Sequence, residues 1–310
     1  MLDIKWVLTN LDAVKAGLSK RGQSIDLSGL EKLNQQRKTL QHEFDTLRAS
    51  QNKASADIQK LQKEKQDASS LIAEMQGISK RIKEINPELA AIEKEVEDFL
   101  MRVPNLPHSS VPLGASSEEN AIVRTWGEKP TFSFTPKAHW EIGENLKILD
   151  FERATKISGA RFTLYWKQAA QLERALINFM LDLHTSEHGY SEVLPPFLVN
   201  DKSLEGTGQL PKFEEDLFKT TAGYYLIPTA EVPVTNIHRD EILKEEELPL
   251  SYTAYTPCFR SEAGSYGKDV RGLTRQHQFN KVELVKFVTP ESSYNELEKL
   301  TSHAEKILQK

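Results

Sequence analysis

The sequence has a single cysteine, Cys258, which excludes both a disulfide framework and a zinc site built from several cysteines. No apolar run approaches the roughly 18 residues that a transmembrane helix needs. The N-terminal residues, Met1 to Trp6, lack the basic start and apolar core of a signal peptide. These absences predict a cytoplasmic protein without a membrane segment, and no metal-ligating residue is assigned.

A dominant charge and the common nucleotide-binding motifs are missing as well. The net charge is −5 over 310 residues, so no global basic field indicates nucleic acid, and any RNA contact must come from a local patch. Neither G-x-G-x-x-G nor G-x-x-x-x-G-K occurs, which argues against the parallel nucleotide-binding folds. The length leaves room for about two domains.

What the sequence does contain, first of all, is two long apolar rows with heptad-like steps. They are separated by the polar stretch 62–70, and together they predict an antiparallel coiled-coil hairpin over about residues 27–101. Arg37 is the polar exception in the first row, and Pro87 predicts a kink or a helix restart in the second. The apolar positions are Leu30, Leu33, Leu40, Phe44 and Leu47, then Leu71, Met75, Ile78, Ile82, Ile85, Leu89, Ile92, Val96 and Phe99.

Charge is uneven along this predicted arm. Residues 32–65 carry a net charge of +4, whereas residues 84–98 carry −5. A basic half on an acidic protein is a place where RNA phosphates could dock. The ordinary alternative is the solvated face of a coiled coil, which the sequence alone favours.

Beyond the arm, prolines mark a linker at 104–114, so the predicted domains are 1–103, 104–114 and 115–310. The third segment mixes short strands with helices, and strands joined by hairpins with helices packed on them predict an α+β fold with an antiparallel sheet. The expected helices are 169–184, 232–238 and 293–308, and the expected strands are 190–199, 224–228, 253–260 and 274–288.

The last two strands form the most informative part of the chain, a predicted hairpin that carries a polar row. Because side chains alternate faces along a strand, Arg260 and Glu262 are predicted to share one face. A plain core strand would be apolar on its buried face, so this row implies a ligand with negative charge, a flat ring and a polar group. On the return strand the shared positions are Arg275, His277, Phe279, Lys281 and Glu283.

This hairpin resembles motif 2 of the class II aminoacyl-tRNA synthetases. Together with Thr229-Ala230-Glu231 and the segment 206–213, it makes the chain similar to the bacterial-type seryl-tRNA synthetase family from residue 1 to residue 310. The resemblance implies ATP-dependent activation of L-serine, with Mg²⁺, and transfer of serine to the 3′ end of serine tRNA. It also implies that the part with the third class II motif is absent, so we expect this chain alone not to aminoacylate measurably.

The resemblance assigns roles to the hairpin residues. Arg260 and Glu262 become the candidate catalytic residues, and both bind ATP together with Phe279. Arg260 would hold the α-phosphate, for which a guanidinium is suited because it forms paired hydrogen bonds and keeps its charge. Glu262 would accept a hydrogen bond from the adenine amino group or orient Arg260, and Phe279 would stack on adenine.

The implied serine site draws on a second segment. Thr229, Ala230 and Glu231 would line the pocket with Arg260, and Glu231 would lie near the substrate ammonium. Glu283 would bind the substrate hydroxyl. If alanine bound instead of serine, this carboxylate would be left without a partner, and the site would therefore select strongly for serine. Thr229 before an apolar turn also fits a helix N-cap, and that alternative stays open.

The remaining implied partners are tRNA and a second copy of the chain. The arm would embrace serine tRNA, reading shape and backbone more than bases. The helix from residue 169 and the strand from residue 190 resemble motif 1, which implies a homodimer. Three alternatives remain: a non-catalytic tRNA-binding or regulatory relative, a structural coiled-coil protein that explains only the arm, and a different class II synthetase. Against the last, the Thr-Ala-Glu tripeptide, Glu283 and the long N-terminal arm argue for serine. The candidate tRNA-binding residues are Lys53, Lys60, Lys63 and Lys65 on the arm, and Lys268 and Arg271 in the hairpin loop.

Overall fold

The structure is a computed structural model that describes residues 2–114, 116–263 and 271–310. It divides into two compact units, Met1–Gly127 and Glu128–Lys310. Each unit has its own secondary structure and its own buried core. The finer division into a domain, a proline-rich linker at 104–114 and a second domain stays a prediction.

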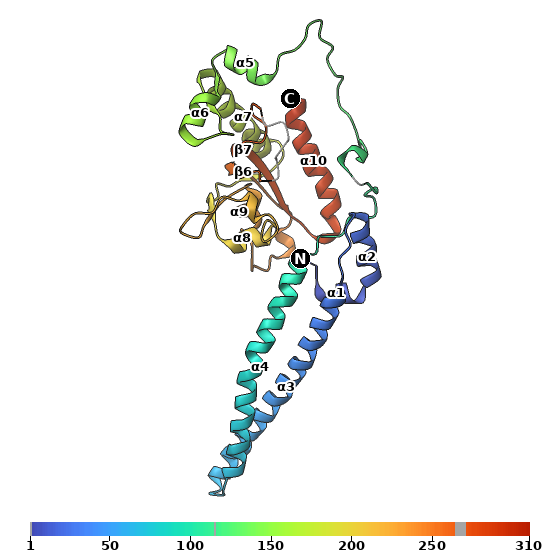
Figure 1. The fold of residues 1–310 in the computed structure, drawn as a ribbon, viewed down its shortest axis with the longest axis vertical. Coiled ribbons are helices and arrows are strands. Elements are labelled where there is room, and N and C mark those ends of the chain that lie inside the picture. Colours follow the sequence, from blue (N-terminus) through green and yellow to red (C-terminus); the bar gives the residue numbers. More distant parts are fainter. Residues whose placement is uncertain (1, 115, 264–270) are drawn as a thin grey trace. The chain divides into compact units, whose positions relative to one another are not determined.

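The first unit is helical and is dominated by two long antiparallel helices that lie side by side (Figure 1). They confirm the predicted helical hairpin. The second helix runs through Pro87 without an interruption, so the predicted restart is wrong. Because a proline removes only one helical hydrogen bond, packing against the partner helix can hold the helix together there. The elements are α1 (Ile4–Thr9), α2 (Leu11–Lys20), α3 (Ser28–Lys63), α4 (Ser69–Arg102) and the short 3₁₀ turn η1 (Ser117–Glu119).

The seam between α3 and α4 is apolar along its centre and tied by polar contacts at its edge. Ile85 is fully buried in the seam. Across its edge, Arg81 Nε donates to Glu43 Oε1 at 2.7 Å, and Arg81 Nη2 donates to Glu43 Oε2 at 3.1 Å. Arg37, the polar exception in the first row, is half-buried, and its Nη2 donates to Asn34 Oδ1 at 3.3 Å. The repeat therefore tolerates one charged residue there, although among the described residues the buried Arg37 Nε finds no hydrogen-bond partner.

The base of the arm is closed by a compact apolar core. There α1 and α2 pack against the start of α3 and the end of α4. Each of these helices buries its apolar face only against the others, so together they form a small domain. The buried members are Val7, Val14, Leu18, Leu27, Leu30, Val96, Leu100 and Val103.

The second unit is an α+β fold around a long antiparallel hairpin, as predicted. Strand β6 (Leu250–Phe259) pairs with β7 (Gln278–Phe287), and the short β3 (Ser191–Glu192) adds a parallel pair on the other side of β6. The predicted strand 190–199 is split into β3 and β4 at Pro195–Pro196, since proline cannot donate to a ladder. The two-stranded sheets are β1 (Leu149–Asp150) with β2 (Leu164–Tyr165), and β4 (Leu198–Val199) with β5 (Tyr225–Leu226).

Helices cover both faces of the hairpin (Figure 1). On one face, α7 reaches β7 through Glu173, whose Oε1 accepts from Asn280 Nδ2 at 2.9 Å. On the opposite face, the turn before α9 reaches β7 through Lys281. The helices and 3₁₀ turns are α5 (His139–Asn145), α6 (Phe151–Ser158), α7 (Lys167–Ser186), α8 (Asp201–Gly206), η2 (Glu214–Asp216), α9 (Glu231–Thr235), η3 (Glu245–Glu247), η4 (Pro290–Ser292) and α10 (Ser293–Gln309).

Helix α9 is held in place by a close approach to α8 at Gly206. A Cβ added to Gly206 would lie 2.8 Å from Asn236 Oδ1, so only glycine fits without a shift. Asn236 Nδ2 donates to the carbonyls of Ser203 at 2.9 Å and Val232 at 2.8 Å, which ties the two helices together. The segment 206–213, to which the sequence assigned no chemistry, thus begins with a packing contact that positions α9.

Candidate active site

One face of the β6–β7 hairpin combines small buried residues on β6 with large polar ones on β7. Cys258 lies opposite Phe279, Thr256 opposite Lys281, and Ala254 opposite Glu283. The three β6 residues are fully or almost fully buried, whereas their β7 partners are partly exposed. Since residues directly opposite each other in a ladder point to the same face, the small side chains give the large ones room to extend. This arrangement confirms the predicted shared face for Phe279, Lys281 and Glu283.

The other residues of the predicted row do not belong to the strands. Strand β6 ends at Phe259 and β7 begins at Gln278, so Arg260, Glu262 and Arg275 lie beyond the ladder. Glu262 and Arg275 have φ angles of 52° and 54°, in the left-handed region where strand alternation does not apply. The prediction that alternation sets their direction is therefore wrong for these two residues.

Arg260 is nevertheless held over the Phe279 ring. Its guanidinium carbon lies 5.1 Å from the ring centroid, a cation–π distance. Its Nε donates to the Pro228 carbonyl at 3.2 Å, and its backbone N–H donates to the His277 carbonyl at 2.9 Å. Backbone and side-chain contacts together fix a positive charge beside an aromatic face.

Glu262 and Arg275 meet across the open end of the hairpin. Arg275 Nη1 donates to Glu262 Oε2 at 3.2 Å, and the Glu262 side chain is only 12% exposed. Asp216, a residue that the sequence analysis missed, supports this turn: its Oδ1 accepts from Ala263 N at 2.9 Å and its carbonyl from Ser261 N at 2.9 Å. It lies far from the hairpin in sequence, so no local pattern could have indicated it.

The Thr229-Ala230-Glu231 segment forms the start of α9 and faces β7. Thr229 and Ala230 are buried, and Thr229 Oγ1 accepts from the backbone N–H of Glu231 at 3.1 Å. Thr229 Oγ1 also donates to Glu283 Oε2 at 2.6 Å. The hydroxyl therefore accepts from the first N–H of α9 and donates to the candidate specificity residue. The N-cap residue of α9 is Ala230, so Thr229 precedes the cap, and its place in a serine pocket stays a prediction.

The structure adds Lys281 to the same cluster. Lys281 Nζ lies 2.6 Å from Thr229 Oγ1 and 2.6 Å from Glu283 Oε2. The sequence indicated Lys281 only as a polar neighbour of Phe279. The signal that could have found it is its place between Phe279 and Glu283 on one strand face.

Glu231 completes the group of charges. Although the residue as a whole is exposed, packing around its carboxylate raises its pKa, and the negative charge of Glu283 adds to this. Lys281 and Arg260 oppose the change and lower the pKa. The cluster thus brings two carboxylates and two cations together, and the other three charges act on the pKa of Glu231.

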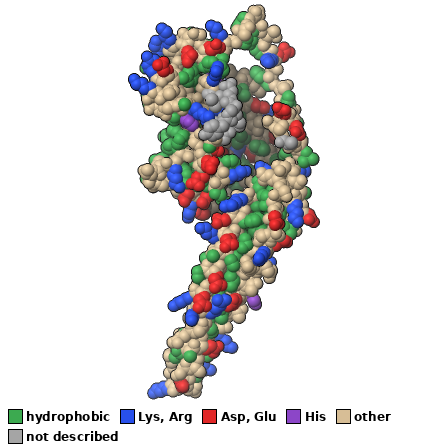
Figure 2. All heavy atoms as spheres, viewed as in Figure 1, with side chains coloured by type: hydrophobic (Ala, Val, Ile, Leu, Met, Phe, Trp, Pro, Cys, Tyr) green, Lys and Arg blue, Asp and Glu red, His purple; other side chains and the backbone are tan. Residues whose placement is uncertain are grey.

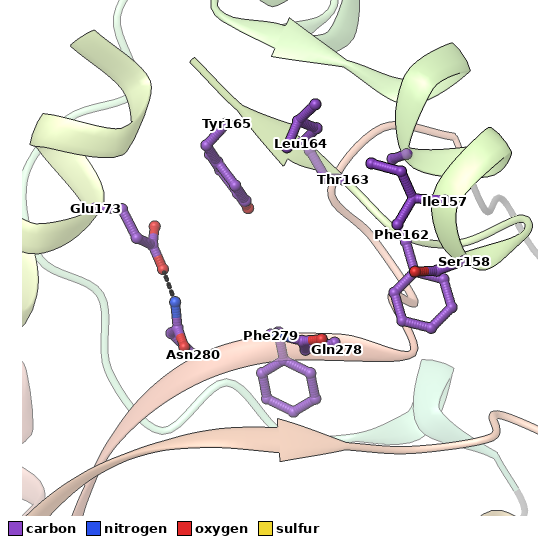
Figure 3. Close-up of a pocket in the computed structure, with 11 residues that line it drawn as sticks. Ile157, Ser158, Phe162, Thr163, Leu164, Tyr165, Glu173, Gln278, Phe279 and Asn280 are labelled. Carbon is purple, nitrogen blue, oxygen red and sulfur yellow. Dashed lines mark hydrogen bonds between the residues drawn. The ribbon is translucent and has the colours of Figure 1, made fainter. Parts of the chain in front are cut away.

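A separate cavity of about 260 Å³ lies on the opposite face of β7 (Figure 3). Tyr165 and Leu164 from β2, Glu173 from α7 and Asn280 from β7 line it, and the Phe279 ring points away from it. It does not contain Arg260, Thr229 or Glu283. The cavity therefore shares the Phe279 position with the polar cluster but none of the cluster's charged residues.

The candidate tRNA-binding residues divide between the two units. Lys53, Lys60, Lys63 and Lys65 are exposed on the arm, and Figure 2 shows Lys and Arg side chains at its tip, interspersed with acidic ones along its length. Arg271 is exposed beside the hairpin loop. Lys268 lies outside the described residues.

Neither a metal centre nor a membrane helix is found in the described part of the chain. Within residues 2–114, 116–263 and 271–310, no three His, Cys, Asp or Glu side chains come together in a way that could hold a metal ion. No helix in those ranges is both long and apolar enough to cross a membrane.

Comparison with known proteins gives the family. Residues 1–107 match the seryl-tRNA synthetase N-terminal domain, and residues 212–310 match the tRNA synthetase class II core domain (G, H, P, S and T). A serine–tRNA ligase from Trichlorobacter lovleyi is 61% identical over 310 residues, which is 100% of this chain and 73% of the relative. The chain belongs to the seryl-tRNA synthetase family. A serine–tRNA ligase from Listeria welshimeri, 56% identical over 314 residues, also has 73% of its length covered.

Solved structures agree with this membership in the seryl-tRNA synthetase family. The seryl-tRNA synthetase of Pyrococcus horikoshii, complexed with ATP, matches with a TM-score of 0.88 and 36% identity over 100% of this chain and 74% of that one. The cytoplasmic serine–tRNA ligase of Naegleria fowleri, in complex with AMP, matches with a TM-score of 0.83 and 23% identity over 100% and 76%, which shows a shared fold.

Proposed function

We propose that the chain carries the site of a serine–tRNA ligase, at which L-serine is activated with ATP and the seryl group is passed to the 3′ end of serine tRNA. The observation that carries this proposal is one continuous cluster. A guanidinium lies over the Phe279 ring, and beside it a Thr229–Glu283 pair is built on the start of α9. The first half suits a nucleotide phosphate and base, and the second suits a small polar amino acid. The relatives named serine–tRNA ligase support the pairing of these two ligands.

In the first step, an oxygen of the serine carboxylate attacks the α-phosphorus of ATP. The bond from that phosphorus to the bridging oxygen breaks, and pyrophosphate leaves. Arg260 would hold the α-phosphate while negative charge builds up on the phosphate oxygens, and Phe279 would stack on adenine. In the second step, a hydroxyl of the terminal tRNA ribose attacks the seryl carbonyl and AMP leaves. Positioning and charge stabilisation account for this chemistry without a covalent enzyme intermediate.

Serine would be recognised through its hydroxyl and its ammonium. Glu283, with Thr229 beside it, would accept the hydroxyl hydrogen bond, and alanine would leave that carboxylate unpaired. The Glu231 carboxylate would bind the ammonium. Burial and Glu283 raise the pKa of Glu231, and a cation bound beside it would bring the pKa down again.

Mg²⁺ would enter with ATP and would supply positive charge to the phosphate groups. The described residues do not supply a cluster of metal ligands, so no step is assigned to a metal held by the protein.

A homodimer and a cytoplasmic location complete the proposal. Helix α7 carries Leu172, Leu176 and Phe179 at steps of four and three, 59%, 43% and 37% exposed. Such a stripe on one helical face is apolar surface that a second copy of the chain would cover around a two-fold axis. The cytoplasm is where aminoacylated tRNA is consumed by ribosomes.

The direct test is binding, because the curated relatives are longer than this chain and binding needs only the residues named above. Calorimetry would compare a seryl-sulfamoyl adenosine, which mimics seryl-adenylate and cannot be hydrolysed, with its alanyl counterpart. We expect tighter binding of the seryl compound, by roughly 10²-fold or more. Equal affinity for the two, or no binding of either, would overturn the serine assignment. The expectation that this chain alone does not aminoacylate stays a prediction, which robust serine-dependent ATP–pyrophosphate exchange would contradict.

The arm has a test of its own. Replacing Lys53, Lys60, Lys63 and Lys65 by glutamine is expected to weaken serine tRNA binding and to flatten its salt dependence, because fewer counterions are released. Affinity for seryl-sulfamoyl adenosine should be unchanged. An unaltered salt slope would remove tRNA binding from this part of the arm, and tRNA binding without any adenylate binding would favour the non-catalytic relative.

A further inference from the structure

Lys281 is the one member of the polar cluster to which the proposed chemistry gives no task. It lies on β7 between Phe279 and Glu283, on the same face, opposite the fully buried Thr256. Its side chain is 32% exposed, so its ammonium is partly withdrawn from water. An ammonium that loses part of its hydration needs other hydrogen-bond or ion-pair partners to compensate. It finds them in Thr229 Oγ1 and Glu283 Oε2, each at 2.6 Å.

The contacts around Thr229 fix the direction of its hydroxyl hydrogen. A threonine hydroxyl has one donor and two acceptor positions. The backbone N–H of Glu231 and the Lys281 ammonium both donate to Thr229 Oγ1. The hydroxyl proton must then go to Glu283 Oε2, as the 2.6 Å contact indicates. Thr229 is therefore fully used by the protein and is not itself a free partner for a substrate.

The two oxygens of Glu283 are left in different states. The hydrogen bond from Thr229 and the ion pair with Lys281 both end on Oε2. A carboxylate offers about four lone-pair positions, so Oε1 keeps acceptor capacity for a ligand. With one oxygen clamped at two points, the plane of the carboxylate and the direction of Oε1 are both set before a ligand arrives.

The charges explain why the clamp has to be cationic. Glu283 is close enough to Glu231 that its negative charge raises the pKa of Glu231. Two neighbouring carboxylates resist ionising together. Lys281 and Arg260 supply the opposing positive charge. Without Lys281, Arg260 would be the remaining cation that opposes the effect of Glu283 on Glu231.

We propose that Lys281 is a positioning residue for serine selection. Its ammonium and the Thr229 hydroxyl hold Glu283 Oε2, so that Oε1 is presented as an acceptor to the substrate hydroxyl. The inference rests on the proposed function and deepens it, because it names what makes Glu283 an acceptor with a fixed direction. Lys281 acts through Glu283 and leaves ATP binding to Arg260 and Phe279.

The test uses the variants Lys281→Met and Lys281→Arg, with calorimetry on seryl- and alanyl-sulfamoyl adenosine and on ATP. Lys281→Met keeps the length of the stem and removes the charge. We expect it to reduce the preference for the seryl over the alanyl compound by roughly ten-fold or more, through weaker seryl binding, with ATP affinity unchanged. Lys281→Arg restores a cation and is expected to recover part of the preference.

The matched control is Lys286→Met, on the same strand and in a comparable ion pair, Lys286 Nζ to Glu296 Oε2 at 2.7 Å. It should leave the seryl preference intact, which separates the loss of any β7 ion pair from the loss of this one. Circular dichroism and the retained ATP affinity establish that each variant is folded. The inference is overturned if Lys281→Met keeps the full preference, or if it weakens ATP, seryl and alanyl compounds equally.

Failure of the inference is distinguishable from failure of the proposed function. If the unmodified protein does not prefer the seryl compound, the serine assignment itself is wrong, whatever Lys281 does. If the unmodified protein has the preference and Lys281→Met keeps it, only the role of Lys281 falls.

Discussion

The arm and the hairpin site are built on opposite principles. The arm repeats one apolar contact many times along α3 and α4, and its polar contacts, such as Arg81 with Glu43, lie at a half-exposed edge. The hairpin site makes few contacts, each different, among charged groups such as Lys281 and Glu283 that are partly withdrawn from water. Repetition spreads stability over many residues, so single edge changes matter little. The site concentrates its function in a few groups, so single changes there matter for binding while the fold persists.

The largest effect on stability is expected in the seam of the arm. Ile85 is fully buried. Ile85→Ala therefore leaves a cavity, and it is expected to lower the free energy of unfolding by about 2–5 kcal/mol. Thermal and denaturant unfolding of the first unit would show the loss, while binding of seryl-sulfamoyl adenosine stays unchanged. The half-buried Ile78, changed to alanine, is the matched control and should cost less. Equal effects at both positions would mean that the seam is packed more loosely than described.

At the site, the corresponding change is Arg260→Ala. It removes the cation held over Phe279 and is expected to weaken binding of ATP and of seryl-sulfamoyl adenosine by roughly 10- to 100-fold, since a charged hydrogen-bond partner of phosphate is lost. The melting temperature should change little, which is the reverse of Ile85→Ala. Lys202→Ala, at an exposed position on α8, serves as the control. Unchanged ATP affinity would remove Arg260 from the phosphate site.

The two units should also differ in their response to acid. Burial lowers the pKa of His184 to about 4, and the positive charges of His188 and His303 add to this. Because the folded pKa lies below the unfolded value, the unfolded state binds more protons as the pH falls from about 6.5 towards 4, and stability is lost over that window. From pH 7 to pH 5 the loss is expected to be on the order of 1–2 kcal/mol in the second unit.

Hydrogen exchange at these two pH values would locate the loss in α7 and α10 while α4 keeps its protection. The charged groups around the three rings are Glu187, Lys306 and Lys310 near His188, and Lys286, Glu296 and Lys299 near His303. His184→Phe should flatten the pH dependence, whereas His42→Gln, at an exposed position on the arm, should not. A pH dependence that survives His184→Phe would point to another group.

The smallest effect is expected from the edge of the arm. The Arg81–Glu43 pair is 39% and 38% exposed, so water competes for both partners. Glu43→Gln should therefore shift the melting temperature no more than Glu74→Gln, a change at an exposed position without this partner. A clear loss for Glu43→Gln alone would show that the arm depends on its edge contacts as well as on its apolar seam.

Features that repeat along the chain, or that are local, could be predicted from the sequence. The heptad-like rows predicted the helical hairpin, because a helical period is written into spacing alone. Alternation on β7 predicted that Phe279, Lys281 and Glu283 share a face. The quoted motifs were enough to indicate the family, which the comparisons confirmed.

Other features depend on residues distant in sequence, or on backbone outside the helices and strands, and these could be seen only in the tertiary structure. The left-handed φ angles of Glu262 and Arg275 broke the predicted alternation, since strand periodicity ends where the ladder ends. Asp216 supports the hairpin turn from a separate segment, and Thr229 meets Lys281 and Glu283 where the start of α9 packs on β7. Sequence spacing carries no information about such meetings, because the distance between these groups in space is set by packing and not by their separation along the chain.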